Sequence, residues 1–321
     1  MKVRALVTLL CLGITFASWS VAIAAGPPVP LNYWGSLGPA VGQLDHPLSV
    51  ATDGLGSFFV TDQHNQRVIV YSAAGVVTGG WAVPGVPPDF YSFPTGIAVS
   101  ASGNVYVSEN HSHRISVWTK GGALLRYIGV GLLTYPVQVA LDAAENVYVA
   151  SSGDNRIVKL ASDGTFLTAW GTLGAAPGQF SNPYGVDVDA SGNVYVSEYG
   201  NHRVQKFTST GLFLYGWGAF GNGNGQFYSP EGMAHDAAGN LYVCDTGNNR
   251  IQVFSSSGAY LMQFGTYGSG FGQMYTPSGI TLDPSGNVYE CEWNNARVGV
   301  WGQAATPAHN TSWGTLKAKY R

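Results

Sequence analysis

The sequence predicts an all-β fold, a six-bladed β-propeller of four-stranded antiparallel blades, and two observations lead to it. The first is the stretch 182–218, where four apolar runs of about five residues are separated by turns rich in Gly, Asn, Asp and Ser. Apolar residues that alternate with polar ones between such turns are typical of strands joined by hairpins. One four-stranded meander cannot bury both of its faces alone, so this stretch needs similar neighbours.

The second observation is that this unit occurs six times. The arginine that opens the predicted third strand recurs at spacings of 47, 42, 47, 47 and 47, as Arg67, Arg114, Arg156, Arg203, Arg250 and Arg297. A proline before the first strand recurs with the same spacings, as Pro47, Pro94, Pro136, Pro183, Pro230 and Pro277. A period near 45 residues with four strands per unit predicts a propeller, and six units predict six blades.

The repeat has a recognisable pattern: P-x-G-[IV]-x-[VL]-D, then G-N-[VL]-Y-V-x-[DE], then N-x-R-[IV]-x-x-F and W-G. It is nearly complete in residues 230–265, and copies in register cover roughly residues 31–301. This pattern resembles the NHL repeat, and the resemblance implies the propeller fold. It implies less about activity, because NHL-like propellers include RNA-binding modules, extracellular sensor domains and a metal-dependent lyase.

Residues 1–24 have the features of a secretory signal peptide. A basic start is followed by an apolar segment that ends near Ser20, and Ala22-Ile-Ala24 places small residues at the cleavage spacing. A membrane anchor would need about 20 unbroken apolar residues. We therefore expect a secreted or periplasmic protein with no membrane span after signal removal. The propeller is expected over residues 25–302, followed by a tail over 303–321.

The charge of the mature chain argues against nucleic acid as a partner. Removal of the signal segment takes away Lys2 and Arg4, which leaves 13 basic against 18 acidic residues and a net charge of −5. Affinity for a phosphate backbone comes from clustered Lys and Arg. The one basic cluster, residues 317–321, lies in the predicted tail.

One aromatic position predicts how the ring closes. Trp34 lies 33 residues before Arg67, and the same distance separates an aromatic residue from the arginine in four later repeats. Trp34 is thus in register as a fourth strand with no first three strands ahead of it. We expect residues 31–35 to complete the last blade, which leaves no open sheet edge there. The alternative is that residues 312–314, around Trp313, supply this strand.

Five of the six repeats place an acidic residue five positions before the arginine. Both residues flank the same four-residue loop, so we interpret them as ion pairs that clamp each hairpin, rather than as carboxylates around a cation. The third repeat has Ser151 at the acid position, and Asp154 is expected to serve its arginine. The predicted clamp residues are Asp62, Arg67, Glu109, Arg114, Arg156, Glu198, Arg203, Asp245, Arg250, Glu292 and Arg297.

No metal site, cofactor or catalytic residue is predicted from the histidines. A zinc site requires several converging ligands. In the amidating lyases that the repeat resembles, metal-binding histidines follow the blade-opening prolines. Those positions here hold Leu48, Thr95, Val137, Tyr184, Glu231 and Ser278. His235 is expected in the core, and solvated loop positions are expected for His64, His111 and His202.

The two remaining cysteines are expected to be free. Cys244 and Cys291 are 47 residues apart and so occupy the same site in adjacent blades. Packed sheets lie about 10 Å apart, whereas a disulfide needs Cα atoms within roughly 7 Å.

The predicted binding face carries the loops before each arginine and the connections between blades, because these segments are longer, more varied and more aromatic. Aromatic and small polar groups suit recognition of a protein or carbohydrate ligand. Asp187 is added because it is the one acidic residue in the predicted channel-lining set. The predicted ligand-binding residues are Tyr135, Tyr184, Asp187, Tyr199, Glu231 and Trp293.

The sequence therefore predicts an exported, non-catalytic recognition or scaffold propeller. The alternative is a metal-dependent hydrolase or lyase centred on the channel, with Asp187 in its site. Such propeller enzymes use scattered channel carboxylates and leave little linear pattern.

Overall fold

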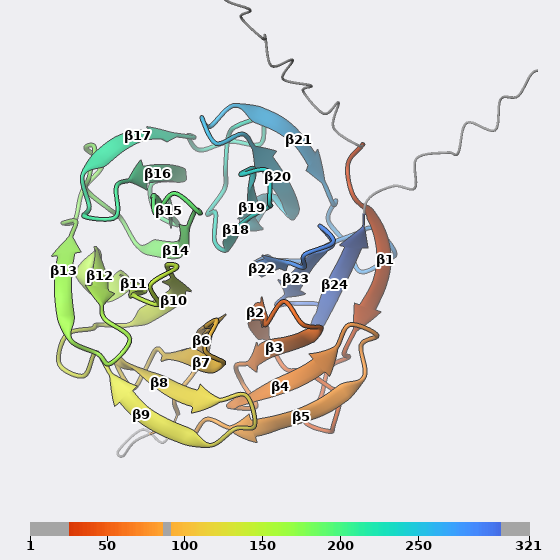
Figure 1. The fold of residues 1–321 in the computed structure, drawn as a ribbon. Helices are drawn as coiled ribbons and strands as arrows, with labels where there is room; N and C mark the ends of the chain where they lie inside the picture. Colours follow the sequence, from red (N-terminus) through yellow and green to blue (C-terminus); the bar gives the residue numbers. More distant parts are fainter. Residues whose placement is uncertain (1–25, 86–90, 303–321) are drawn as a thin grey trace, which may run out of the picture.

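The computed structural model describes residues 26–85 and 91–302. They form six four-stranded antiparallel sheets around a central axis, as Figure 1 shows, and this confirms the predicted six-bladed propeller. The predicted signal segment over 1–24, the tail over 303–321 and the alternative closing strand at Trp313 lie outside the described residues.

The first five blades run from the innermost to the outermost strand in chain order. Blade one comprises β2 (Pro47–Thr52), β3 (Ser57–Asp62), β4 (Arg67–Ser72) and β5 (Val77–Ala82). Blade two comprises β6 (Pro94–Val99), β7 (Asn104–Glu109), β8 (Arg114–Thr119) and β9 (Leu124–Ile128). Blade three comprises β10 (Pro136–Leu141), β11 (Val147–Ser151), β12 (Arg156–Leu160) and β13 (Phe166–Trp170). Blade four comprises β14 (Pro183–Val188), β15 (Val194–Glu198), β16 (Arg203–Phe207) and β17 (Phe213–Trp217). Blade five comprises β18 (Met233–His235), β19 (Leu241–Asp245), β20 (Arg250–Phe254) and β21 (Tyr260–Phe264). Short 3₁₀ turns, η1 (Ser152–Asp154) and η2 (Thr246–Asn248), lie in two of the hairpin loops.

The sixth blade closes the ring with a strand from the other end of the chain. It comprises β22 (Pro277–Leu282), β23 (Val288–Glu292), β24 (Arg297–Gly302) and β1 (Val29–Trp34). β1 pairs antiparallel with β24, with Trp34 opposite Val298. The closing strand is thus the N-terminal one, as the register of Trp34 predicts, and it begins two residues earlier than expected.

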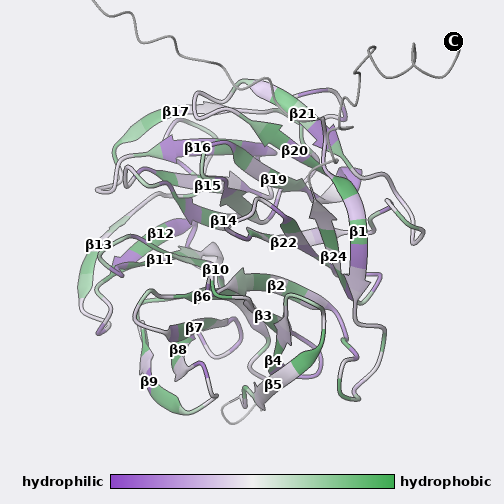
Figure 2. Cartoon of the chain, turned by 45° about the vertical axis from the view of Figure 1, so that its right-hand side comes forward, coloured by the Kyte–Doolittle hydropathy of each residue, from purple (hydrophilic) through white to green (hydrophobic). Residues whose placement is uncertain are grey.

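The core lies between neighbouring blades. Hydropathy varies along the strands and does not divide the propeller into a polar and an apolar half (Figure 2). Each of six hydrophobic clusters joins two adjacent blades, for example Phe59 and Val70 of blade one with Ile97 and Trp118 of blade two. The second strands, such as β3 and β11, are therefore buried along almost their whole length, because both faces of a blade pack against a neighbour.

Glycine allows the inner strands to approach each other closely. A Cβ atom on Gly185 would lie 2.3 Å from the carbonyl oxygen of Glu231 in the next blade, and one on Gly232 would lie 2.4 Å from that of Ser278. Real Cβ atoms do not approach a backbone oxygen so closely. In the four blades that have it, the Pro-x-Gly motif thus allows the innermost strand to lie close to the next blade.

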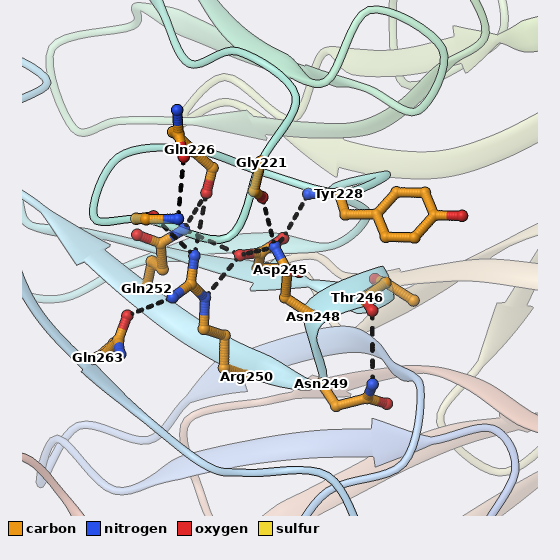
Figure 3. A network of polar contacts seen from close by, with 12 residues as sticks. Gly221, Gln226, Tyr228, Asp245, Thr246, Asn248, Asn249, Arg250, Gln252 and Gln263 are labelled. Atoms are coloured by element: carbon orange, nitrogen blue, oxygen red, sulfur yellow. Dashed lines mark hydrogen bonds and ion pairs between the residues drawn. The ribbon is translucent and has the colours of Figure 1, made fainter.

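The acid and arginine positions form buried ion pairs that also hold the loops between blades. Figure 3 shows the pair of blade five, in which Arg250 Nε lies 2.7 Å from Asp245 Oδ2. The same guanidinium donates to the carbonyl oxygens of Gly223 and Gln226 in the preceding connection. Asp245 also accepts from the backbone N–H of Tyr228. Each clamp therefore fastens a hairpin to the segment that enters its blade.

The other repeats use the same arrangement. Pairs of blades one, two, four and six have N–O distances of 2.5–2.8 Å, namely Asp62–Arg67, Glu109–Arg114, Glu198–Arg203 and Glu292–Arg297. In the third blade Arg156 lies 3.1 Å from Asp154, and both side chains are about one-third exposed. Cys244 and Cys291 are buried free thiols.

A buried acid departs from the repeat in the closing blade. Glu290 is fully buried at the position where the other repeats have Val60, Val107, Val149, Val196 and Val243. Its Oε1 accepts a hydrogen bond of 3.2 Å from the indole N–H of Trp301, whereas its Oε2 has no protein partner among the described residues. Burial raises the pKa of Glu290 well above its usual value, and the nearby Glu292 adds to this.

This raised pKa predicts a stability change with pH. The folded state keeps a proton on Glu290 that the unfolded chain loses near pH 4.5, so the free energy of unfolding falls as pH rises above that value. Glu290→Gln removes this pH-dependent fall in the free energy of unfolding, because the amide does not titrate. It is expected to stabilise the protein relative to the unchanged chain at pH 8, because an amide needs no proton to remain neutral when buried, and to have little effect at pH 4. Thermal unfolding of both proteins from pH 4 to 8 checks this, and parallel pH curves would contradict it.

Candidate ligand-binding site at the channel mouth

Two adjoining cavities lie on the predicted binding face. The first, here called the mouth cavity, has a volume of about 320 Å³ and is lined by Leu48, Gln63, Thr95, Asn110, Val137, Tyr184, Glu231 and Trp293. The second, the side cavity, has a volume of about 370 Å³ and is lined by Tyr135, Val137, Ser152, Gly153, Asn182, Tyr184 and Tyr199. The two share Val137 and Tyr184, so they form one continuous surface around the channel entrance.

Two register positions build the mouth cavity. One is the residue that directly follows the blade-opening proline. This position contributes Leu48, Thr95, Val137, Tyr184 and Glu231. The other is the residue after the clamp acid, which begins the loop between the second and third strands, and it contributes Gln63, Asn110 and Trp293. Because the clamp fixes the start of each loop, these side chains project from rigid backbone.

Five of the six predicted ligand-binding residues line these cavities. Tyr184, Glu231 and Trp293 line the mouth cavity, and Tyr135, Tyr184 and Tyr199 line the side cavity. The rings of Tyr184 and Tyr199 are stacked, with centroids 6.4 Å apart.

Gln63, Thr95 and Asn110 are mouth residues that the sequence did not single out. The register of Gln63 and Asn110 matches that of Tyr199 and Trp293, and this match could have identified them.

Glu231 is the one acidic residue in the lining of the two cavities. It is only 7 % exposed, and its Oε2 has no protein hydrogen-bond partner among the described residues. Burial raises the pKa of Glu231 to about 8, against a smaller opposing effect of the Tyr184 hydroxyl. At neutral pH the group is therefore mostly a neutral carboxylic acid that can both donate and accept a hydrogen bond.

The other polar groups of the mouth are held by their neighbours. The indole N–H of Trp293 donates to Gln63 Oε1 at 3.4 Å, and the Asn110 amide donates to the carbonyl oxygen of Pro136 at 3.1 Å. Thr95 donates to the carbonyl oxygen of Val137 at 3.0 Å. The cavity thus presents fixed aromatic rings and amides around one neutral acid.

The sixth predicted residue, Asp187, lies apart from this group. It lines a narrower cavity of about 200 Å³ inside the channel, together with small residues such as Ala51, Ala98 and Ala140. Its Oδ2 lies 2.6 Å from Nδ1 of His235 in the next blade, and His235 Nε2 has no protein partner among the described residues. From the sequence we predicted the two residues separately, Asp187 as a single acid in the channel lining and His235 as a core residue. The structure shows one cross-blade pair.

The repeats match a known family model. The NHL repeat model matches residues 91–118, 180–207 and 227–254, in blades two, four and five. The chain is an NHL-repeat propeller. No curated protein matches this NHL-repeat propeller.

Solved structures share its fold at low sequence identity. Virginiamycin B lyase from Staphylococcus aureus is similar with a TM-score of 0.57 and 17% identity over 80% of each chain. A gluconolactonase from Xanthomonas campestris is similar with a TM-score of 0.62 and 16% identity over 88% of this chain and 99% of its own. A protein of unknown function from Bacteroides thetaiotaomicron has a TM-score of 0.65 and 19% identity over 85% of this chain and 73% of its own. At these identities the likeness concerns the fold alone.

Within residues 26–85 and 91–302, no helix of the NHL-repeat propeller has the length and apolar character needed to cross a membrane.

Proposed function

We propose that this NHL-repeat propeller is an exported, non-catalytic recognition module that binds a neutral carbohydrate at the mouth cavity. The observation that carries the proposal is the convergence of Tyr184, Glu231 and Trp293 in one cavity of about 320 Å³. Cavities of roughly 300 Å³ and above are typical of small-molecule sites. Export to the periplasm or the outside of the cell is supported by the signal-like segment over residues 1–24.

The chemistry of the lining favours a hydroxyl-rich, uncharged ligand. Sugar rings offer C–H faces that pack on aromatic rings, here those of Tyr184, Tyr199 and Trp293. Their hydroxyl groups can pair with the amides of Gln63 and Asn110. A neutral acid at position 231 adds a donor and an acceptor without requiring a cationic ligand. The residues that line the two cavities include no Lys or Arg, which argues against an anionic ligand.

The proposal is tested by binding of the labelled protein to an array of neutral oligosaccharides, followed by titration with the strongest sugar. Trp293→Ala is expected to weaken binding at least tenfold because it removes one aromatic wall. Tyr91→Ala serves as the control, because Tyr91 is an exposed aromatic residue that lines neither cavity. Glu231→Gln is expected to keep binding at pH 7, and Glu231→Val to lose it. Absence of array binding, or equal binding by Trp293→Ala, would overturn the proposal.

The pair formed by Asp187 and His235 favours a second candidate, a metal-dependent hydrolase or lyase centred on the channel. An aspartate that orients a histidine with one free nitrogen is suited to acid–base work or to metal binding. Elemental analysis separates the two candidates. One tightly bound divalent ion per chain that Asp187→Asn removes would favour the enzyme over the recognition module.

A further inference from the structure

Three potential metal ligands meet on blade one beside the mouth cavity. Single ligand atoms of Asp45, His46 and His64 all lie within 4.8 Å of one another. Asp45 Oδ1 lies 2.5 Å from Nδ1 of His46 and 3.5 Å from Nδ1 of His64. Two imidazoles and one carboxylate form a ligand set that zinc accepts. We propose that these three side chains bind a divalent transition-metal ion, with zinc as the ion that fits best.

The backbone brings the three positions together. The N–H of His64 donates to the carbonyl oxygen of Asp45 at 3.1 Å, which joins the hairpin loop to the segment before β2. The N–H of Asp45 donates to Oδ1 of the clamp acid Asp62 at 2.7 Å. Other blades make the same connections; in blade four, for example, Gly200 N–H donates to the carbonyl oxygen of Ser181. The ligands are therefore placed by a rigid feature of the repeat, and side-chain rotation has to bring the three ligand atoms to bonding distances of about 2.0–2.2 Å from one ion.

The side chains at these positions are special to blade one. The positions of Asp45, His46 and His64 are occupied in the other blades by Ser92, Phe93 and His111; Thr134, Tyr135 and Gly153; Ser181, Asn182 and Gly200; Tyr228, Ser229 and Gly247; and Tyr275, Thr276 and Asn294. None of these sets offers three ligands. In blade two the ring of Phe93 packs tilted against that of His111 with centroids 4.2 Å apart, and the rings of His46 and His64 pack in the same way with centroids 4.0 Å apart. Because Phe93 occupies the position of His46 in a blade of the same fold, the fold itself does not require a histidine at position 46.

The cluster is open to solvent and borders the proposed ligand site. The side chains of Asp45, His46 and His64 are 32 %, 28 % and 39 % exposed, so an ion can reach them. The ring of Trp293, which lines the mouth cavity, lies 4.1 Å from that of His46. Three protein ligands leave a zinc ion at least one free position, which is typical of sites that bind water or a substrate. The metal site stands on its own geometry and does not depend on the carbohydrate proposal.

The test is calorimetric titration of zinc chloride into the purified, EDTA-treated protein without a polyhistidine tag. We expect one ion per chain and at least a tenfold loss of affinity in both His64→Ala and Asp45→Asn. His111→Ala is the matched control, because it removes a histidine from the same loop position in blade two, and it should bind zinc as the unchanged protein does. Thermal unfolding of the apo proteins verifies that the exposed substitutions leave the fold intact.

A spectroscopic readout locates the ion. Cobalt(II) added in place of zinc should give the visible absorption of a low-coordinate site, and this band should disappear in His64→Ala and persist in Asp187→Asn. Failure of the unchanged protein to bind zinc more tightly than His64→Ala would overturn the proposal. Loss of the cobalt band in Asp187→Asn alone would also overturn it, because the ion would then lie in the channel.

Discussion

Replacing Trp34 with alanine is expected to destabilise the propeller by about 3–5 kcal/mol, the usual cost of removing a large buried aromatic residue. Trp34 is 3 % exposed, and its ring packs against those of Phe58, Tyr71 and Tyr289 at centroid distances of 5.2–5.6 Å. It joins blade six to blade one. Denaturant unfolding measures the effect. Leu31→Ala is the control in the same strand, since Leu31 is 52 % exposed, and it should cost less than about 1 kcal/mol.

Deletions extend the same prediction to the whole closing strand. Removing residues 26–36 takes away β1 and leaves the edge of β24 unpaired, so we expect aggregation or a large fall in melting temperature. Removing residues 303–321 should have a much smaller effect. The opposite result would mean that the strand around Trp313, and not β1, completes the last blade.

Replacing Arg203 with alanine should destabilise the protein by about 3–5 kcal/mol, because it leaves a buried charge without its partner. Arg203 Nε lies 2.5 Å from Glu198 Oε1, and the Glu198 side chain is fully buried. The guanidinium also donates to the carbonyl oxygens of Ala175, Ala176 and Gln179. All of these acceptors lose a donor in the variant.

The third blade supplies the matched control for this prediction. Arg156 occupies the same position, but it pairs with a partly exposed Asp154 and faces Ser151 where the other blades have a buried acid. Arg156→Ala should therefore cost only about 1 kcal/mol, as for other exposed pairs. Denaturant unfolding of the two variants side by side measures the difference. Equal losses would show that burial of the acid does not determine the strength of the clamp.

The features that depend on a regular repeat could be predicted from the sequence. The proline and arginine spacings were sufficient for six blades, because each repeat forms one sheet with local hairpins. The register of Trp34 predicted the closing strand, with residues 312–314 as the alternative, and the pairing of β1 with β24 confirms the N-terminal strand. Tyr184 and Trp293 were predicted as aromatic residues of the long-loop face, and both line the mouth cavity.

Features that depend on contacts between repeats could not be predicted in the same way. Asp187 and His235 belong to different blades, and the 2.6 Å distance between them follows from how closely the inner strands pack. His64 looked like an isolated loop residue because its approach to Asp45 depends on a backbone bond between two segments that are not adjacent in sequence. Glu290 replaces a valine on a strand whose pattern gives no reason for a buried acid. In each case the sequence shows a residue that departs from the repeat, but it does not show which residue that side chain contacts.

The pairing of β1 with β24 also determines the order in which the molecule can be completed. Every other blade takes all four of its strands from one repeat, so its sheet does not depend on a distant part of the chain. β1 is synthesised first but must wait for the last strand, so the nascent chain passes through an open arc with Phe58 and Tyr71 uncovered by Trp34. A chain that stops anywhere before β24 cannot close at all. Closure therefore reports whether the chain extends through β24, because only such a chain can cover Trp34 and pair its first strand.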